Sequence, residues 1–205
     1  MDTKQKILEE ALSLFSERGY ANVFVGEIAR RVGIKAPSLY KHFKSKQAIF
    51  DAIIGEMQRR FLEQARLLSI HGNNPEEDAE IYSQLPEADL VRLGINLFLF
   101  QLHDDYARRI RKMMTIEQFH NRDLADEYTR RYIDDPMTYF RSLLQRAAEQ
   151  GVLQADSAEV MTLQFYAPFY TLMTVCDRNP EREPESVRLL ENHIRQFNKL
   201  YGRIL

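Results

Sequence analysis

Residues 24–46 constrain the fold of this chain more than any other segment, because they hold two helix patterns separated by a turn signal. Ile28 and Val32 lie four residues apart and give the first helix one apolar face. Gly33 follows directly and can adopt the left-handed conformation that ends a helix. Pro37 suits the first turn of the next helix, where its missing N–H costs nothing. The segment therefore predicts two short helices joined by a tight turn, the arrangement of a helix-turn-helix.

The second predicted helix combines an apolar face with an outward face rich in hydrogen-bond donors. Leu39 and Phe43 lie four residues apart and can pack against the first helix. The donors are Lys35, Ser38, Tyr40, Lys41, His42 and Lys46. Most protein–DNA hydrogen bonds go to phosphate and sugar, and the free N–H groups at the helix start also favour an anion. We interpret this helix as one that enters the DNA major groove; a solvated basic surface helix is the alternative.

Residues 6–54 resemble the DNA-binding domain of the TetR family of one-component bacterial transcription regulators. The residues that carry the resemblance are, in order, Ile7, Ala11, Leu12, Phe15, Gly19, Tyr20, Ile28, Ala29, Gly33, Ile34, Ser38, Leu39, Tyr40, His42, Phe43, Lys44, Ser45 and Lys46. The rest of the chain resembles the family only in the number, length and order of its helices. The resemblance implies an all-α fold, with an N-terminal three-helix DNA-binding domain over residues 1–50 and a helical effector-binding and dimerisation domain over residues 51–205.

The resemblance also implies roles for single residues of the motif. Contacts to base edges or nearby sugars are implied for Ala36, Pro37, Ser38, Lys41 and His42, and contacts to phosphates for Tyr40 and Lys46. The sequence departs from the family pattern at the first helix of the motif. Phe24 and Val25 stand where Thr or Ser is usual, and Gly26 stands where a basic or polar residue often follows. These departures weaken the expectation that the first helix contacts DNA.

The distribution of charge supports a nucleic-acid-binding N-terminus. The net charge of the chain is only −2, but residues 1–50 hold nine Lys or Arg against five Asp or Glu. A basic module on an acidic body suits local steering toward phosphates. The single cysteine, Cys176, excludes an internal disulfide, and the N-terminus lacks the apolar core of a signal peptide. The most apolar run, 93–102, is too short for a bilayer. We expect a cytoplasmic protein without membrane contact.

Helical patterns continue to the end of the chain. Thr3 is predicted to cap a first helix that stops at Gly19, and Ser45 is predicted to cap a fourth over residues 46–68. The segment 71–80 is rich in Gly, Asn, Pro and acidic residues, which predicts a mobile loop. Further helices are predicted over residues 86–102, 104–114, 122–150 with a break near Pro136, 157–176 with Pro168 inside, and 185–201.

The last two predicted helices carry apolar side chains on more than one face, whereas packing against a single core requires only one apolar face. Such helices are buried on two sides, and the second side can be another subunit or an intrachain core. The resemblance favours the subunit, because members of the family form homodimers through a four-helix bundle built from these two helices. The expected interface residues are Val160, Leu163, Ala167, Tyr170, Leu190, Ile194, Phe197 and Tyr201.

Aromatic residues, methionines and a few polar groups in the body predict a pocket for a largely apolar effector, with ordinary core packing as the alternative. The candidate ligand-binding residues are Asn96, Phe100, Met113, Met114, Phe119, His120, Tyr139, Phe165, Tyr166, Phe169 and Met173. Glu117 and His120 match half of a helical di-metal motif, but the second half is not evident. The sequence contains no HExxH, GxSxG or glycine-rich phosphate loop. We therefore expect no catalytic residues, no metal site, no cofactor and no enzymatic activity.

These patterns together predict a sequence-specific DNA-binding transcriptional regulator. The expected form is a homodimeric repressor that a small-molecule effector releases from a near-palindromic operator. One alternative is a helical small-molecule-binding protein or enzyme with no regulatory DNA site. A DNA-packaging protein is a further alternative, which the acidic body disfavours.

Overall fold

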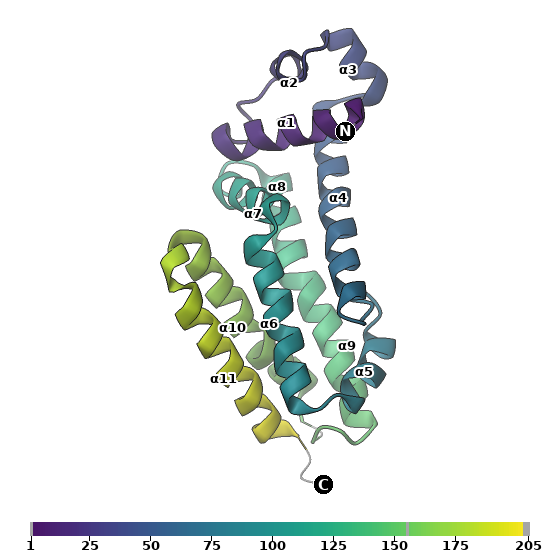
Figure 1. The fold of residues 1–205 in the computed structure, drawn as a ribbon, viewed down its shortest axis with the longest axis vertical. Helices are drawn as coiled ribbons and strands as arrows, with labels where there is room; N and C mark the ends of the chain where they lie inside the picture. Colours follow the sequence, from purple (N-terminus) through teal and green to yellow (C-terminus); the bar gives the residue numbers. More distant parts are fainter. Residues whose placement is uncertain (1, 155, 203–205) are drawn as a thin grey trace. The chain divides into compact units, whose positions relative to one another are not determined.

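A computed structural model describes residues 2–154 and 156–202 of the chain. Helices make up almost all of the regular structure, and the described ranges contain no β-strand (Figure 1). Within these ranges, an isolated bridge pairs Leu153 with Gly202. The all-α prediction is therefore confirmed.

The first helices have almost the bounds that the sequence predicts. They are α1 (Thr3–Arg18), α2 (Val25–Val32), α3 (Ala36–His42) and α4 (Lys46–Leu67). Asp2 rather than Thr3 caps α1, because its carboxylate accepts the backbone N–H of Gln5 at 2.8 Å. The predicted cap of α4 is confirmed, since the hydroxyl of Ser45 accepts the N–H of Ala48 at 3.0 Å.

The predicted mobile loop over residues 71–80 is wrong. The helix α5 (Pro75–Gln84) begins inside it, and Asn74 caps that helix. The carboxylate of Asp78 is fully buried and accepts the N–H groups of His71 and Gly72 at 2.7 and 2.8 Å. The Asp78 carboxylate thus supplies the acceptors that the backbone N–H groups of this loop need. These hydrogen bonds hold the loop in one conformation.

The remaining helices form the greater part of the body. They are α6 (Glu87–His103), α7 (Asp105–Glu117), α8 (Arg122–Thr129), a π-turn η1 (Arg130–Asp134), α9 (Asp135–Glu149), α10 (Ala158–Arg178), a 3₁₀ turn η2 (Pro180–Arg182) and α11 (Glu183–Tyr201). The predicted helix over residues 122–150 thus carries a π-turn where a break was expected.

Pro136 accounts for this π-turn. Proline has no N–H, so the carbonyl of Tyr132 loses the donor that an α-helix would supply four residues later. The backbone N–H of Asp135 instead reaches the carbonyl of Arg130, five residues back. The hydroxyl of Tyr166, from α10, donates to the carbonyl of Tyr132 at 2.7 Å. A side chain from another helix therefore bonds to the backbone at the point where proline interrupts the α-helical pattern.

The chain divides into two compact units that do not follow the chain order. The first unit contains the residues up to Arg60 together with Asp105–Tyr128, and the second contains Phe61–Asp104 together with the residues from Thr129 onward. Within the first unit α1 packs against both α2 and α7, and α2 packs against α3. The helix-turn-helix is therefore supported by a segment that lies more than sixty residues further along the chain.

The second unit is a bundle in which α10 packs against α6, α9 and α11, and α5 packs against α9. Figure 1 shows α10 and α11 running side by side along this bundle. One apolar core cluster of the bundle consists of Ala79, Leu143, Leu144, Ala147, Leu153, Met161, Phe197 and Tyr201. The domain boundary that the sequence predicts near residue 50, inside the fourth helix, stays a prediction.

Candidate nucleic-acid interface

The turn between α2 and α3 has the geometry that the sequence predicts. Gly33 adopts a left-handed conformation with φ 83° and ψ 28°. Its N–H bonds to the carbonyl of Arg30, and the N–H of Ile34 bonds to the carbonyl of Ala29 at 2.9 Å. Leu39 on α3 is fully buried. The apolar face of α3 is therefore fixed against the module, which leaves its other face to solvent.

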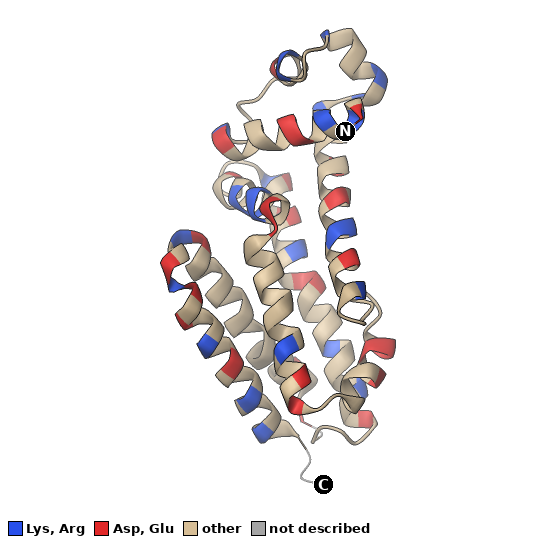
Figure 2. Cartoon of the chain, viewed as in Figure 1, with Lys and Arg blue, Asp and Glu red and all other residues tan. Residues whose placement is uncertain are grey.

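The outward face of α3 presents the predicted donors. Figure 2 shows basic residues near both ends of α3. Solvent reaches Ala36 and Ser38 partly, and it reaches Lys35, Pro37, Tyr40, Lys41 and His42 extensively. A helix N-terminus and five side-chain donors on one exposed face match what a major groove and its phosphates require.

Lys46 differs from the other predicted DNA contacts. Its ammonium donates to the carbonyls of Tyr20, Val23 and Ala21 at 2.9, 3.1 and 3.4 Å. It also lies 4.3 Å from the centroid of the Tyr20 ring. Burial lowers the pKa of Lys46, and the negative charge of Glu117 opposes that shift. A contact between Lys46 and a phosphate would require the ammonium to leave this cage.

The start of α2 is held by side chains rather than by a capping hydroxyl. Glu27 accepts the N–H of Phe24 at 2.9 Å and pairs with Arg18 at 2.8 Å. These two interactions lower the pKa of Glu27. The Phe24 ring itself is 70% exposed. The backbone of this turn is therefore fixed while its side chain faces solvent.

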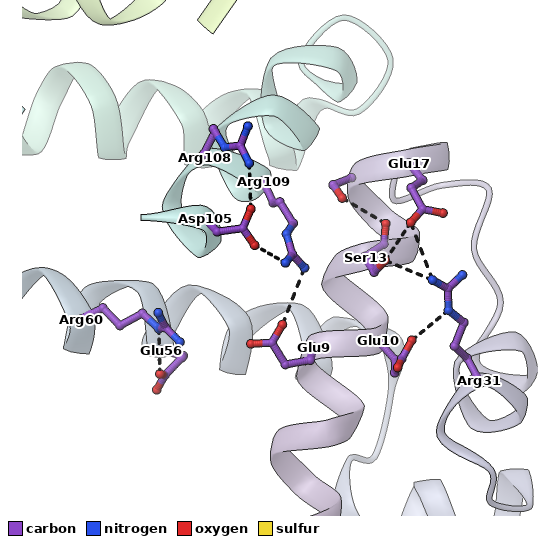
Figure 3. Close-up of polar contacts among 11 residues, drawn as sticks. Glu9, Glu10, Ser13, Glu17, Arg31, Glu56, Arg60, Asp105, Arg108 and Arg109 are labelled. Carbon is purple, nitrogen blue, oxygen red and sulfur yellow. Dashed lines mark hydrogen bonds and ion pairs between the residues drawn. The ribbon is translucent and has the colours of Figure 1, made fainter. Parts of the chain in front are cut away.

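Ion pairs connect α1 to its neighbours within the first unit. Figure 3 shows Arg31 of α2 between Glu10 and Glu17 of α1, with the Arg31–Glu10 pair at 2.8 Å. The same view shows Arg109 of α7 paired with Asp105 and approaching Glu9 of α1 at 3.6 Å. Surface pairs of this kind contribute little energy individually, and here they link α2 and α7 to α1.

A shallow hollow of about 540 Å³ lies in the second unit, between the end of α4 and α6. Among the predicted ligand-binding residues it contains Asn96 and Phe100. Sequence reasoning missed its other lining residues, Gln64, Leu68, Leu99, His103 and Asp104. They mix polar and apolar groups without a motif, so only their placement in space identifies them.

The other predicted ligand-binding residues lie elsewhere. The first unit holds Met113 and Met114, which are buried, and Phe119 and His120, which are exposed. The second unit holds Tyr139, Phe165, Tyr166, Phe169 and Met173.

Two tyrosines of this set have structural hydrogen bonds. The hydroxyl of Tyr139 donates to Asp78 at 2.6 Å, and that of Tyr166 donates to the backbone of Tyr132. Burial raises the pKa of Tyr139 far above its usual range. Both hydroxyls are therefore already partnered in this state of the protein.

The predicted dimer residues fall into two groups. Those on α11, namely Leu190, Ile194, Phe197 and Tyr201, are buried within a single chain. On α10, Val160 and Leu163 are 49% and 56% exposed. On α11, Leu189 and Leu200, which the sequence analysis did not select, are 39% and 60% exposed. Their spacing places them on a stripe beside the buried one, a signal that the more regular buried seam obscured.

Within the described part of the chain, no helix combines the length and the apolar character that crossing a membrane requires.

Comparison with known proteins agrees with this geometry. Residues 7–53 match the family described as bacterial regulatory proteins, tetR family. In three dimensions the chain is similar to SmeT, the repressor of the Stenotrophomonas maltophilia multidrug efflux pump SmeDEF, in its complex with triclosan. The TM-score is 0.70 at 21% sequence identity, over 99% of this chain and 93% of SmeT. The chain belongs to the TetR family.

Sequence relatives of this TetR-family protein are regulators as well. It is 26% identical over 193 residues to IcaR of Staphylococcus aureus, the HTH-type negative transcriptional regulator of the biofilm operon icaADBC. That match covers 84% of this chain and 97% of IcaR. It is also 28% identical over 130 residues to the HTH-type transcriptional regulator YdgC of Bacillus subtilis, over 58% of this chain and 67% of YdgC. The protein is therefore a TetR-family transcriptional regulator.

Proposed function

We propose that this TetR-family regulator is a homodimeric repressor that binds a near-palindromic operator and leaves it when a small molecule binds. The observation that carries the proposal is the outward face of α3, where exposed donors project from a helix whose other face is buried. Such a helix fits the major groove. Repression rather than activation is supported by the name of IcaR as a negative regulator.

Within this proposal, Lys41 and His42 read base edges together with Ser38, while Tyr40 and Lys35 contact the backbone. Lys41 is exposed near the end of α3, and a lysine can donate to guanine O6 and N7. Ala36 and Pro37 come close to sugars or thymine methyl groups at the start of the helix. Lys46 contacts a phosphate only in a state in which its carbonyl cage opens.

The dimer in this proposal forms through the exposed apolar stripes of α10 and α11. Val160 and Leu163 continue toward Ala167 and Tyr170 on α10, and Leu189 and Leu200 lie on α11. Apolar side chains exposed on two neighbouring helices are typical of a helix-bundle interface between subunits. The residues of α11 that the sequence analysis expected at the interface, Leu190, Ile194, Phe197 and Tyr201, would instead pack inside each chain beneath this interface.

The effector site in this proposal is the hollow between α4 and α6. Leu68, Leu99 and Phe100 offer apolar contacts, and Asn96 and Asp104 offer polar ones. A largely apolar molecule with one or two hydrogen-bonding groups fits such a lining. The complex of SmeT with triclosan supports a small-molecule effector for a protein of this fold. The named relatives are transcriptional regulators, which supports a regulatory rather than an enzymatic role.

Selection of binding sites from random duplex DNA tests the DNA-binding part of this proposal. The purified full-length protein should enrich two inverted half-sites whose centres lie about one helical turn, roughly 34–36 Å, or a multiple of it apart. Affinity should fall steeply as salt rises, because phosphate contacts release counterions. Recovery of sequences with no shared motif would contradict the proposal.

A ligand screen by thermal shift tests the effector part. Compounds that raise the melting temperature should also release the selected operator in fluorescence anisotropy. Phe100→Ala should weaken both effects of such a compound, whereas Phe119→Ala, at an exposed phenylalanine outside the hollow, should leave them unchanged. Equal effects of the two variants would exclude this hollow as the effector site.

A further inference from the structure

Glu117 is a buried carboxylate for which the proposed function provides no role. It is the last residue of α7 and is only 4% exposed. Its Oε2 atom is buried and has no hydrogen-bond partner in the described structure. A buried carboxylate is unfavourable unless a charge or donor compensates it. We therefore expect a group near Glu117 that compensates its carboxylate.

Gly19 lies directly against this carboxylate. It ends α1 with φ 82°, a conformation that side chains rarely adopt. A Cβ atom added at Gly19 would overlap Oε1 of Glu117. The carboxylate thus occupies the space that any other residue at position 19 would need, and it touches the start of the turn that leads to α2.

The same turn encloses the ammonium of Lys46. The carbonyls of Tyr20, Ala21 and Val23 accept its three hydrogen bonds, and the Tyr20 ring covers it. The charge of Glu117 interacts favourably with that ammonium. Carbonyl oxygens bring only partial charges, so the carboxylate provides the full negative charge that the enclosed cation otherwise lacks.

We propose that Glu117 is a positioning residue for DNA binding, which fixes the turn of residues 19–23 around the Lys46 ammonium and thereby sets the orientation of α2 and α3. Its carboxylate touches no DNA and acts through the turn. Glu117 lies far outside residues 7–53, which match the family. The DNA readout of this inference rests on the proposed function, whereas the contact with Gly19 can be tested without DNA.

Operator affinity provides the first test, with wild type, Glu117→Gln and Asp123→Asn as full-length proteins. Both substitutions raise the net charge by one, and Asp123 is an exposed residue of α8 in the same unit. A charge change alone would strengthen binding to DNA in both variants. The positioning role instead predicts that Glu117→Gln binds the selected operator about tenfold more weakly than Asp123→Asn.

A double-mutant cycle with Lys46→Met shows whether the loss depends on the enclosed ammonium. In that background Glu117→Gln should change affinity by less than about twofold, because the cation that it compensates is gone. Equal affinities of Glu117→Gln and Asp123→Asn would overturn the inference. An undiminished loss in the Lys46→Met background would overturn it as well, since Glu117 would then act without Lys46.

Thermal unfolding of Gly19→Ala in two backgrounds tests the contact itself. Gly19 has φ 82° and ψ 154°, a conformation that strains alanine whether or not Glu117 is present. Only the overlap of the new Cβ with the carboxylate depends on Glu117. Gly19→Ala should therefore lower the melting temperature more in the wild-type background than in the Glu117→Ala background. Equal effects in the two backgrounds would overturn the inference.

The glycine cycle uses Glu117→Ala rather than Glu117→Gln, so its result does not depend on whether the glutamine variant folds. The cycle also distinguishes a failure of this inference from a failure of the proposed function. A wild-type protein that selects no DNA sequence would contradict the proposed function, while the cycle would still show whether Glu117 contacts the turn at Gly19.

Discussion

Lys41 and Lys46 have the same side chain but different surroundings. Lys41 is exposed on α3, whereas the ammonium of Lys46 is enclosed by three carbonyls. The sequence identifies both as donors near a recognition helix. It cannot predict the enclosure of Lys46, because the three carbonyls belong to a turn more than twenty residues earlier. Surroundings of this kind depend on how α1 and α4 meet, which no local pattern records.

Lys41→Ala should relax the sequence preference of the protein at one position of each half-site. A lysine that donates to a guanine contributes discrimination of about 1–3 kcal/mol against the wrong base. Site selection with the variant and with Lys112→Ala, at an exposed lysine of α7, measures the change. If the Lys41 variant returned the wild-type motif at the same stringency, Lys41 would not read a base.

At the scale of single elements, helix ends were predicted well where the signals are local. Gly33 and Pro37 determine their turn through their own backbone preferences, and the structure has both as expected. The helix α5 was missed because its apolar periodicity is weak and a buried acid, Asp78, takes a core position. In a polar stretch, an aspartate predicts a loop, and only the structure shows that Asp78 is buried and accepts hydrogen bonds from two backbone N–H groups.

The start of α2 should lose stability in acid. Glu27 has a lowered pKa because it accepts the N–H of Phe24 and pairs with Arg18. A group whose folded pKa is depressed contributes stability above its usual value of 4.5, and that contribution is lost as the pH falls through the folded pKa. The melting temperatures of wild type and Glu27→Gln should therefore differ most near neutral pH and converge as the pH falls below the lowered folded pKa of Glu27. A difference independent of pH would contradict this assignment.

The π-turn should depend on the hydroxyl of Tyr166. Tyr166→Phe removes a buried hydrogen bond to the carbonyl of Tyr132, which costs about 0.5–1.5 kcal/mol in the free energy of unfolding by urea. Tyr40→Phe, at an exposed hydroxyl, should change it by less than about 0.5 kcal/mol. Pro136→Ala restores a backbone N–H, so the effect of Tyr166→Phe should shrink in that background. An equal effect in both backgrounds would show that the hydroxyl does not compensate for proline.

At the scale of the whole molecule, the dimer is tested best at residues that no intrachain core uses. Leu163→Asp with Leu200→Asp places charges on the exposed stripes of α10 and α11, which should produce a folded monomer with much weaker operator binding. Leu67→Asp, at a leucine that is 76% exposed at the end of α4, serves as the control. Sedimentation at micromolar concentration measures the assembly, and a double variant that stays dimeric would place the interface elsewhere.

The composition of the first unit, from two segments far apart in the sequence, lies beyond what this sequence predicts. Asp105–Tyr128 joins the helix-turn-helix unit through the ion pair of Arg109 with Glu9 and the contact of Glu117 with Gly19. In the sequence, charged residues on an amphipathic helix are equally consistent with a solvent-exposed face and with ion pairs to another helix. Pairing between positions about a hundred residues apart leaves no periodic signal, so only the folded chain reveals it.

Because the first unit is built from two separate segments of the chain, a chimeric biosensor made from this protein has to include both segments. A designer who wishes to transplant its operator specificity onto another sensor body would normally cut once, after the recognition helix. Such a graft would omit the Glu117 carboxylate and the Arg109 guanidinium. The transplanted turn of residues 19–23 would then contact different side chains in the new protein. A graft that carries Asp105–Tyr128 together with the N-terminal sixty residues keeps the module and its support as one inherited piece.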